Sequence, residues 1–317
     1  AARERRETPP LDGGFSMKVF VTGGSGYIGS AVCLRLKKAG HDVQALVRDK
    51  KKGAPLQAAG VKLVEGDLAQ PSGYAAAAYG VQAFVHCAQD HGPKSVELDR
   101  KTIVNARELL HGRVGATFIY TSGVWVIGDT GGAQFDESRP TNPAKLVAWR
   151  PAHEQLALDM AQEGIRAVVV RPGVVYGGAR GGIPAMLFGA ALKQGAPQIV
   201  GEGANHWPMV HVDDLAELYV RLVERAPAGS IFFAADASTH TMREIAEAVS
   251  RAAGKEGKVT TLPVEKARST MGPFADALAL DQKVSSEKAR NELDWRPRHE
   301  DFVAEAPQLF AEWKAAQ

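Results

Sequence analysis

Three glycines at regular spacing are the first residues whose arrangement suggests chemistry. Gly23, Gly26 and Gly29 lie between an apolar run at 18–22 and a helical pattern at 27–39. In such a turn the first glycine permits a tight bend, the second lets the backbone approach a pyrophosphate, and the third lets the helix pack on the strand. The helix then directs its positive N-terminus at the phosphates. The spacing and its strand–turn–helix context predict a dinucleotide-binding loop.

A charged cluster follows the next expected strand, at 43–47. Arg48 comes directly after that strand and is followed by Asp49 and three lysines. A guanidinium at this point can bind a ribose 2′-phosphate through two hydrogen bonds, whereas a carboxylate would bind the free ribose hydroxyls. Arg48 therefore favours NADP, and Asp49 leaves NAD as the alternative. A solvated basic loop without a ligand is a third interpretation.

The glycine turn belongs to a regular alternation of strands and helices. Apolar runs, mostly separated by helix-length segments, occur at 18–22, 43–47, 61–64, 81–87, 116–121 and 166–171. Strands that are apolar throughout are typical of a parallel sheet covered on both faces. We therefore expect an α/β fold with a Rossmann-type doubly wound parallel sheet, built from right-handed crossovers, as the domain of residues 17–177.

The two ends of the chain have different patterns. The regular alternation of strands and helices ends before residues 178–317. This change predicts that these residues form a smaller C-terminal α/β substrate lobe, with some chain crossing back to the sheet. Residues 1–16 are polar, rich in Pro and Gly, and aperiodic. We expect them to be a disordered leader or a cloning remnant outside the fold.

Composition narrows the class of function. The chain has 317 residues, 45% apolar and 23% charged, which suffices for a large core. Its 38 basic and 36 acidic residues are scattered, so we expect a small-molecule substrate and no nucleic-acid partner. No apolar run approaches the roughly 18 residues of a membrane span, which argues against a membrane partner. Cys33 and Cys87 predict free thiols in a reducing, cytoplasmic compartment.

The glycine loop and four later segments resemble the extended or atypical short-chain dehydrogenase/reductase superfamily, of the NAD(P)-dependent epimerase/dehydratase type. The segments are TGGSGYIG from Thr22, GDL from Gly66, VHCA from Val85, RPGVVYG from Arg171 and VHVDDLA from Val210. Together they cover most of residues 17–316. The resemblance implies a cofactor site, and Arg48 joins it because it follows the second expected strand. The site consists of Thr22, Gly23, Gly26, Tyr27, Ile28, Gly29, Arg48, Asp67, Leu68, Cys87, Ala88, Arg150, Arg171 and Pro172. The resemblance also implies a homodimer through helices near 94–111 and 146–163.

The chain departs from the superfamily where a catalytic pair is expected. Relatives use a Tyr as general acid or base and a Lys four residues later, on one helical face. The corresponding segment, 142–160, contains no Tyr. One register places Leu146 and Arg150 at the two sites, and the other places Trp149 and His153 there. We prefer the first, with Arg150 as a positioning residue, because a guanidinium does not exchange protons at neutral pH.

Reduction of a carbonyl needs a proton donor, so another group or an ordered water has to supply it. The candidates are Tyr176, His86 and Ser122, beside the carboxyl ends of expected strands. Tyr176 also has a structural interpretation, as a packing aromatic, and so does His86, as a structural histidine. Ser122 stands one residue before the superfamily's hydroxyl position, which falls on Gly123, and neighbouring strand residues face opposite sides.

The substrate pocket is expected to be apolar. Relatives that act on nucleotide sugars carry a diphosphate-binding Arg where this chain has Trp207. An indole cannot replace that two-pronged donor, which disfavours sugar diphosphates. We expect Trp125, Tyr176 and Trp207 to line the pocket. We expect no metal site, because His206 and His211 have no acidic or Cys partners at matching spacing.

Three functions remain open. The first is an NADP(H)-dependent oxidoreductase acting on a small, largely uncharged carbonyl, alcohol or activated double-bond substrate without the usual Tyr. The second is a non-catalytic cofactor-binding regulator that resembles nitrogen-metabolite-repression-like proteins, which also lack the Tyr. The third is a nucleotide-sugar epimerase or dehydratase. Turnover with a panel of carbonyl compounds separates the first from the second.

Overall fold

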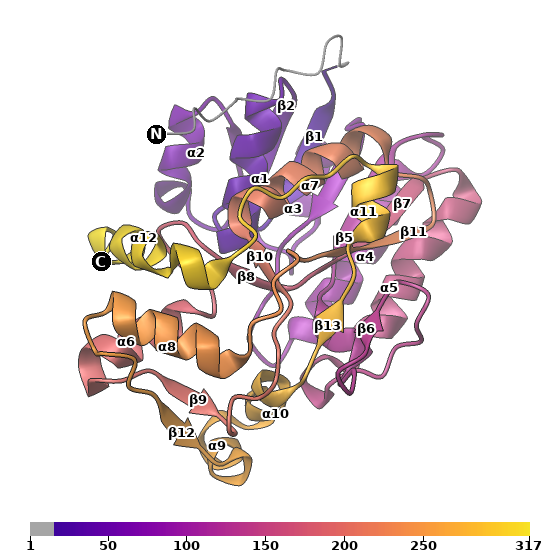
Figure 1. Cartoon of the computed structure of the whole chain (residues 1–317). Helices are drawn as coiled ribbons and strands as arrows, with labels where there is room; N and C mark the ends of the chain where they lie inside the picture. The colour runs from indigo at the N-terminus through magenta and orange to yellow at the C-terminus, as the bar shows by residue number, and fades with distance from the viewer. Residues whose placement is uncertain (1–15) are drawn as a thin grey trace.

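A seven-stranded parallel sheet forms the larger part of the computed structural model, which describes residues 16–317 (Figure 1). In spatial order the strands are β11 (Ser230–Ala234), β7 (Arg166–Pro172), β5 (Thr117–Thr121), β4 (Ala83–His86), β1 (Lys18–Thr22), β2 (Asp42–Val47) and β3 (Lys62–Glu65). The predicted doubly wound α/β fold is thereby confirmed. Apart from Ser16, the expected leader lies outside the described residues.

Both faces of the sheet are buried, because successive side chains of each strand point to opposite faces and most of them are apolar. In β1, Val19 and Val21 join one core and Phe20 joins the other. The first face is covered by α1 (Tyr27–Lys38), α2 (Ala54–Ala58), α7 (Val212–Arg225) and α11 (Glu287–Glu292). The second is covered by α3 (Ser72–Ala78), α4 (Ser95–Leu110), α5 (Arg150–Leu158) and η4 (Asp159–Glu163). Continuously apolar strands are typical of this sandwich.

A smaller lobe lies beside the sheet and has its own core. Its elements are α6 (Ala185–Gln194), β9 (Gln198–Val200), α8 (Met242–Ala252), β12 (Thr260–Leu262), α9 (Val264–Met271), α10 (Pro273–Ala279) and α12 (Phe302–Ala315). Two parallel pairs connect the parts: β8 (Val174–Tyr176) with β10 (Met209–His211), and β6 (Gln134–Phe135) with β13 (Lys283–Val284). The chain after residue 177 thus builds this lobe and also supplies α7, β11 and α11 to the sheet.

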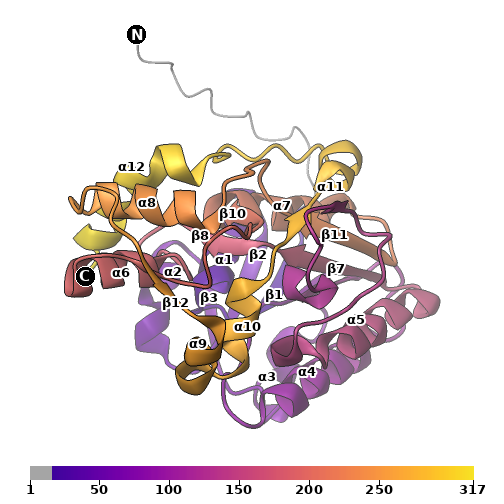
Figure 2. The same ribbon diagram turned by 60° about the horizontal axis from the view of Figure 1, so that its bottom comes forward.

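The strand order reverses between β1 and β4, which are neighbours in the sheet. Chain segments leave these two strands toward opposite faces, so a crevice opens at their carboxyl ends, where ligands bind in open α/β sheets. The remaining short helices are η1 (Lys50–Gly53), η2 (Val124–Ile127) and η3 (Lys145–Val147). Figure 2 shows α4 and α5 side by side on the second face of the sheet.

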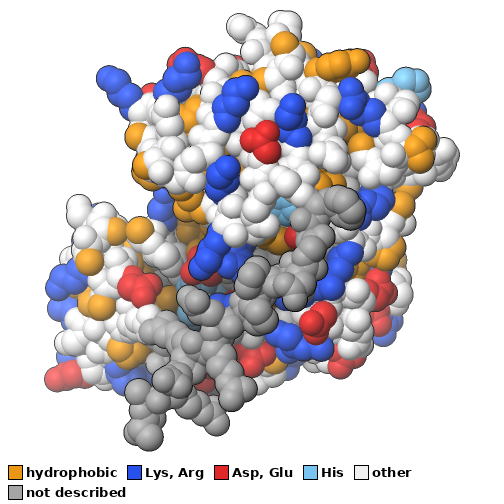
Figure 3. All heavy atoms as spheres, turned by 90° about the horizontal axis from the view of Figure 1, so that it is seen from above, with side chains coloured by type: hydrophobic (Ala, Val, Ile, Leu, Met, Phe, Trp, Pro, Cys, Tyr) orange, Lys and Arg blue, Asp and Glu red, His pale blue; other side chains and the backbone are white. Residues whose placement is uncertain are grey.

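The outer surface and the helices add two observations. On the face drawn in Figure 3, basic and acidic side chains are both distributed over the surface. Among residues 16–317, none of the helices combines the length and the apolar character that crossing a membrane requires.

Candidate functional site

The glycine turn at the switch point is closed tightly enough to exclude side chains. Gly23 has a φ of +71°, and the Gly26 amide donates to its carbonyl at 2.8 Å. A Cβ on Gly29 would lie 2.1 Å from the Gly23 oxygen, and one on Gly23 would lie 2.7 Å from the Cα of Ala88. The turn after β1 therefore packs directly against the turn after β4. Such a cradle suits a pyrophosphate, which approaches backbone rather than side chains.

The helix that follows leaves its N-terminus available to an anion. No side chain caps α1 at Gly26, and its first turn has no acidic residue. Tyr27 and Ile28 are half-buried, and the Tyr27 hydroxyl donates to the Gly177 carbonyl at 2.7 Å. Burial raises the pKa of Tyr27, so this hydroxyl stays protonated as a donor. It ties α1 to the start of the smaller lobe.

The end of β2 presents Arg48 to solvent. Its side chain is 77% exposed, and its nearest acidic partner is Asp90, at 3.9 Å. Asp49 is turned away to cap η1, where its Oδ1 accepts from the Lys51 amide at 2.8 Å. The exposed guanidinium is therefore the more available of the two for a ligand. After β3, the exposed Asp67 accepts from the Ala69 amide at 2.8 Å.

A buried network of polar groups lies behind the carboxyl ends of β1, β4 and β5. The Nδ1 of His86 lies 2.7 Å from the Thr22 hydroxyl oxygen, and its Nε2 lies 3.3 Å from Asp99. Asp99 also accepts from the Tyr120 hydroxyl at 2.8 Å and lies 2.7 Å from the Nδ1 of His153. Burial alone would raise the pKa of Asp99, but the bonds from His153 and His86 lower it below its ordinary value. Asp99 is therefore a buried carboxylate that is hydrogen-bonded to Tyr120 and His153 and lies close to His86.

Arg150 links this network to the strand ends. Its guanidinium donates to the Thr121 carbonyl at 2.9 Å, to the Tyr120 hydroxyl at 3.3 Å and to Gln89 at 2.9 Å. It is buried, and it stacks over the Trp149 ring at 4.6 Å. The first turn of α5 thus fixes a cation at the carboxyl ends of β4 and β5.

The residues that the two registers assign to the catalytic pair lie at different depths in the protein. Leu146 lies on η3 and is 38% exposed, whereas Arg150 reaches the strand ends. His153 is buried beneath them on Asp99, and the half-buried Trp149 lies edge-on to its ring. The structure places Arg150, rather than His153, next to the switch-point crevice.

Other residues expected at the cofactor are engaged within the fold. Arg171 is buried in β7 and pairs through two hydrogen bonds with Glu154, at 3.0 and 2.6 Å, and one buried guanidinium nitrogen has no partner within residues 16–317. Pro172 is buried at the end of that strand. Cys87 is half-buried at the end of β4, and the Thr121 hydroxyl lies 3.6 Å from its sulfur. Leu68 packs against the core of the second sheet face.

The three candidate proton donors differ in their surroundings. Tyr176 is fully buried in the core of the smaller lobe, edge-on to His211 and Phe302. Burial raises the pKa of its hydroxyl, and its position leaves no access to a substrate, so we do not retain it as a donor or as a pocket residue. His86 is engaged by Thr22 and Asp99. Ser122 is buried, and its hydroxyl has no hydrogen-bond partner among the described residues.

The structure brings together a histidine pair that the sequence did not connect. The rings of His211 and His299 stack with centroids 3.7 Å apart, and Asp213 lies near both. The Nδ1 of His211 already accepts from the Asp213 amide, and the Nδ1 of His299 lies 2.6 Å from Glu305. Burial and the neighbouring His299 lower the pKa of His211 to about 4. His211 caps α7 and packs against Tyr176, and the Nδ1 atoms of both histidines already have partners.

The expected pocket residues Trp125 and Trp207 lie apart. Trp207 lines a cavity in the smaller lobe, and its indole donates to the Leu278 carbonyl of α10 at 3.0 Å. Trp125, on η2, packs edge-on against Phe274 at the other end of α10 and does not line that cavity. The expectation of one shared aromatic pocket is therefore corrected, because a helix separates the two rings.

Sequence reasoning missed Asp99, Tyr120 and Gln89, which hold the histidines and Arg150. One signal for Asp99 was present: with Ile103, Ala106 and Leu110 it recurs at helical spacing, which puts a carboxylate on the buried face of α4. A charged residue on such a face needs partners. No local pattern pointed to Gln89, whose role depends on the fold.

Comparison with known proteins identifies the relatives of this chain. Residues 19–235 match the model of the NAD dependent epimerase/dehydratase family. An uncharacterized protein of Schizosaccharomyces pombe is 30% identical over 91% of this chain and 98% of its own length. The 4-hydroxy-2-methyl-3-oxo-4-farnesyl-3,4-dihydroquinoline-1-oxide ketoreductase of Stigmatella aurantiaca is 26% identical over 89% of this chain and 92% of its own. A solved dTDP-glucose 4,6-dehydratase of Streptomyces venezuelae, with NAD and TYD bound, covers 94% of this chain and 97% of its own at 21% identity and a TM-score of 0.80, which shows a shared fold.

Proposed function

Because this chain belongs to the NAD dependent epimerase/dehydratase family, we propose that it is an NADP(H)-dependent oxidoreductase. Its substrate is a small, largely uncharged carbonyl, alcohol or activated double-bond compound, and its proton does not come from the usual Tyr. The observation that carries the proposal is the cradle at Gly23 and Gly29, which excludes side chains, with Arg150 fixed beside it. Gly23, Gly26 and Gly29 would hold the pyrophosphate of the nicotinamide coenzyme, which would supply the hydride chemistry of such a reaction.

The preference for NADP rests on Arg48. Its guanidinium is 77% exposed at the end of β2, while Asp49 is engaged in capping η1. An exposed guanidinium can take a 2′-phosphate through two charge-assisted hydrogen bonds, and a carboxylate committed to a cap is a poorer partner for ribose hydroxyls. NAD stays the alternative, because the solved relative described above holds NAD on the same fold.

Arg150 has the role that the chain itself supplies at the reacting carbonyl. Arg150 holds positive charge at the ends of β4 and β5, where it can bind ribose hydroxyls and stabilise a developing alkoxide. It cannot give up a proton at neutral pH. The Ser122 hydroxyl, although unpartnered among the described residues, is as inaccessible as that of Tyr176, so an ordered water supplies the proton to the substrate oxygen. The Asp99 network beneath positions Arg150 through Tyr120.

Carbonyl reduction is the direction that we favour. A relative with 26% identity over most of both chains is a ketoreductase of a farnesyl-bearing quinoline oxide, which is an apolar ketone. In this chain Trp207 stands where nucleotide-sugar enzymes have an Arg, and its indole is bonded to Leu278. An epimerase or dehydratase of nucleotide sugars would need a replacement for that diphosphate contact, so it is the weaker alternative.

The test is consumption of NADPH by the purified protein with a panel of ketones, aldehydes and enones. We expect turnover with at least one apolar ketone, and a kcat lowered at least tenfold in Arg150→Ala. Arg139→Ala, at an exposed arginine, is the control. If cofactor binds tightly but no panel member is reduced, the regulator hypothesis replaces the enzyme hypothesis.

A further inference from the structure

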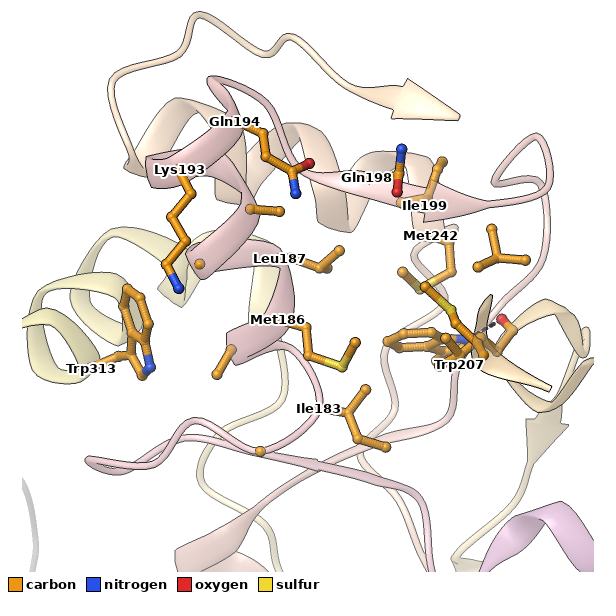
Figure 4. Close-up of a pocket in the computed structure, with 17 residues that line it drawn as sticks. Ile183, Met186, Leu187, Lys193, Gln194, Gln198, Ile199, Trp207, Met242 and Trp313 are labelled. Carbon is orange, nitrogen blue, oxygen red and sulfur yellow. Dashed lines mark hydrogen bonds between the residues drawn. The ribbon is translucent and has the colours of Figure 1, made fainter. Parts of the chain in front are cut away.

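The smaller lobe contains a cavity of about 530 Å³ with mostly apolar walls. Figure 4 shows Ile183, Met186 and Leu187 pointing into a common space, with Trp207 on one side and Trp313 on the other. The volume falls within the range of small-molecule sites. Nothing in the reaction derived above uses this space.

Flexible side chains form a large part of the wall. Met186, Met242 and Met271 all line the cavity, and they are half of the six methionines in the chain. Unbranched thioether side chains adapt to ligands of variable shape, which is why they recur at permissive apolar surfaces. The wall is therefore suited to a chain-like apolar ligand.

Gly189 shows that this space is kept open. It lies inside α6 and lines the cavity, and a Cβ built on it would meet no atom within 4 Å. Glycine in a helix interior costs stability relative to other residues, and here no close packing requires it. Its effect is to leave room in the cavity.

The charge of the wall argues against an anionic or nucleotide ligand. Among the described residues that line the cavity, Lys193 is the single charged one, and it is exposed. A diphosphate needs several converging donors, as arginine forks or helix N-termini provide. An uncharged apolar group meets no such requirement.

One short helix connects the cavity with the reaction site. Leu278 of α10 lines the cavity and accepts from Trp207, while Phe274 of the same helix packs on Trp125. The helix also lies against η3, just before Arg150. A substrate extending along α10 would reach both regions.

We propose that this cavity binds the apolar chain of the carbonyl substrate, so that the enzyme prefers ketones with a long alkyl or prenyl group. The proposal rests on the proposed function for its reactive end and on the cavity for its chain. Each added methylene that enters the cavity raises kcat/KM by roughly fourfold until the space is filled.

The kinetic test compares butanone with methyl decyl ketone. Wild-type protein is expected to favour the long ketone by at least a hundredfold in kcat/KM. Gly189→Leu fills the cavity and is expected to raise KM for the long ketone at least tenfold while leaving butanone unchanged. Gly73→Leu is the control, because Gly73 is an exposed residue of α3 with equal room for a side chain. Equal KM values for the long ketone in wild type and Gly189→Leu would overturn the proposal.

A binding test separates failure of the cavity from failure of the reaction. A bromine-terminated decanol quenches tryptophans that its tail contacts, and it needs no turnover. We expect quenching that is lost in the double variant Trp207→Phe and Trp313→Phe and retained in Trp125→Phe. The same probe should not quench Gly189→Leu. Quenching that persists in the double variant, or no quenching in wild type, would contradict the cavity proposal even if ketones are reduced.

Discussion

At the scale of single residues, the candidate site is defined by which polar groups already have partners in the protein. Arg171 forms a buried pair with Glu154 through two hydrogen bonds, and removing one member of such a pair leaves an uncompensated charge. Asp99 is likewise engaged, by hydrogen bonds with Tyr120 and His153. In contrast, the exposed Arg48 guanidinium remains available for a ligand.

Arg48→Ala tests the cofactor preference. The variant is expected to weaken NADPH binding about tenfold to a hundredfold, because a charge-assisted contact to phosphate contributes about 1.5–3 kcal/mol, and to leave NADH binding unchanged. Titration calorimetry with both nucleotides measures this. The control is Arg139→Ala, at another exposed arginine. An equal loss for both nucleotides would show that Arg48 supplies only general positive charge.

Asp236 is expected to make stability depend on pH. Burial raises its pKa to about 8 in the folded state, against roughly 3.9 in an unfolded chain. The folded state keeps the proton that the unfolded state loses, so this contribution is complete below about pH 4 and is lost as pH rises through 8. Between pH 5 and 8 the free energy of unfolding should fall by on the order of 2–4 kcal/mol.

Urea denaturation of Asp236→Asn checks this expectation. An amide keeps the acceptor for the Ser238 amide but has no charge to bury. The variant should therefore lose most of the decline between pH 5 and 8. The same slope in variant and wild type would mean that other groups cause it.

At the scale of elements, the turn before α1 and the first turn of α5 meet at one edge of the sheet. Parallel strands align their carboxyl ends, so β1 presents the glycine turn where β4 and β5 present their ends to Arg150. The α10 helix lies against the other side of this region through Phe274 and Trp125. The site is thus assembled from the ends of elements, and small shifts of these ends alter it.

Gly29→Ala is the test at this scale. Its Cβ would lie 2.1 Å from the Gly23 carbonyl oxygen, so α1 has to move away from the turn and the pyrophosphate cradle opens. We expect cofactor affinity to fall by about a hundredfold or more while circular dichroism still shows a folded protein. Gly73→Ala, with no atom within 4 Å of its Cβ, should bind like wild type. Normal affinity in Gly29→Ala would contradict the assignment of this turn.

At the scale of the whole molecule, the chain crosses between its two parts. It leaves the sheet after β7, builds part of the smaller lobe and returns through α7 and β11. Tyr27 on α1 bonds to Gly177 at the start of that excursion. The smaller lobe is thereby anchored to the sheet beside the crevice.

A homodimer through α4 and α5 is the prediction at this scale. The two helices lie side by side on one face of the sheet, and Val96 on α4 is 41% exposed (Figure 2). We expect gel filtration to give twice the 33.8 kDa of the chain, and Val96→Asp to give the monomer, because an interface core disfavours charge. A monomer of wild-type protein at micromolar concentration would refute the dimer.

The sequence alone predicted the parts that depend on local pattern. Apolar runs located six of the seven sheet strands, because strands that are buried on both faces are apolar throughout and stand out in the sequence. Glycine spacing located the tight turn, because only glycine fits where a Cβ would meet backbone. The sequence also showed that residues 142–160 contain no Tyr.

Tertiary structure decided what depends on residues distant in the chain. The burial of Tyr176, the partners of Arg150 and His153, and the separation of Trp125 from Trp207 by α10 follow from contacts between segments far apart in sequence. A hydrogen bond or a cavity wall carries no local periodicity, so it has no signature in a window of residues. Local spacing fixed the cofactor turn, and long-range packing fixed which side chains remain available to a substrate.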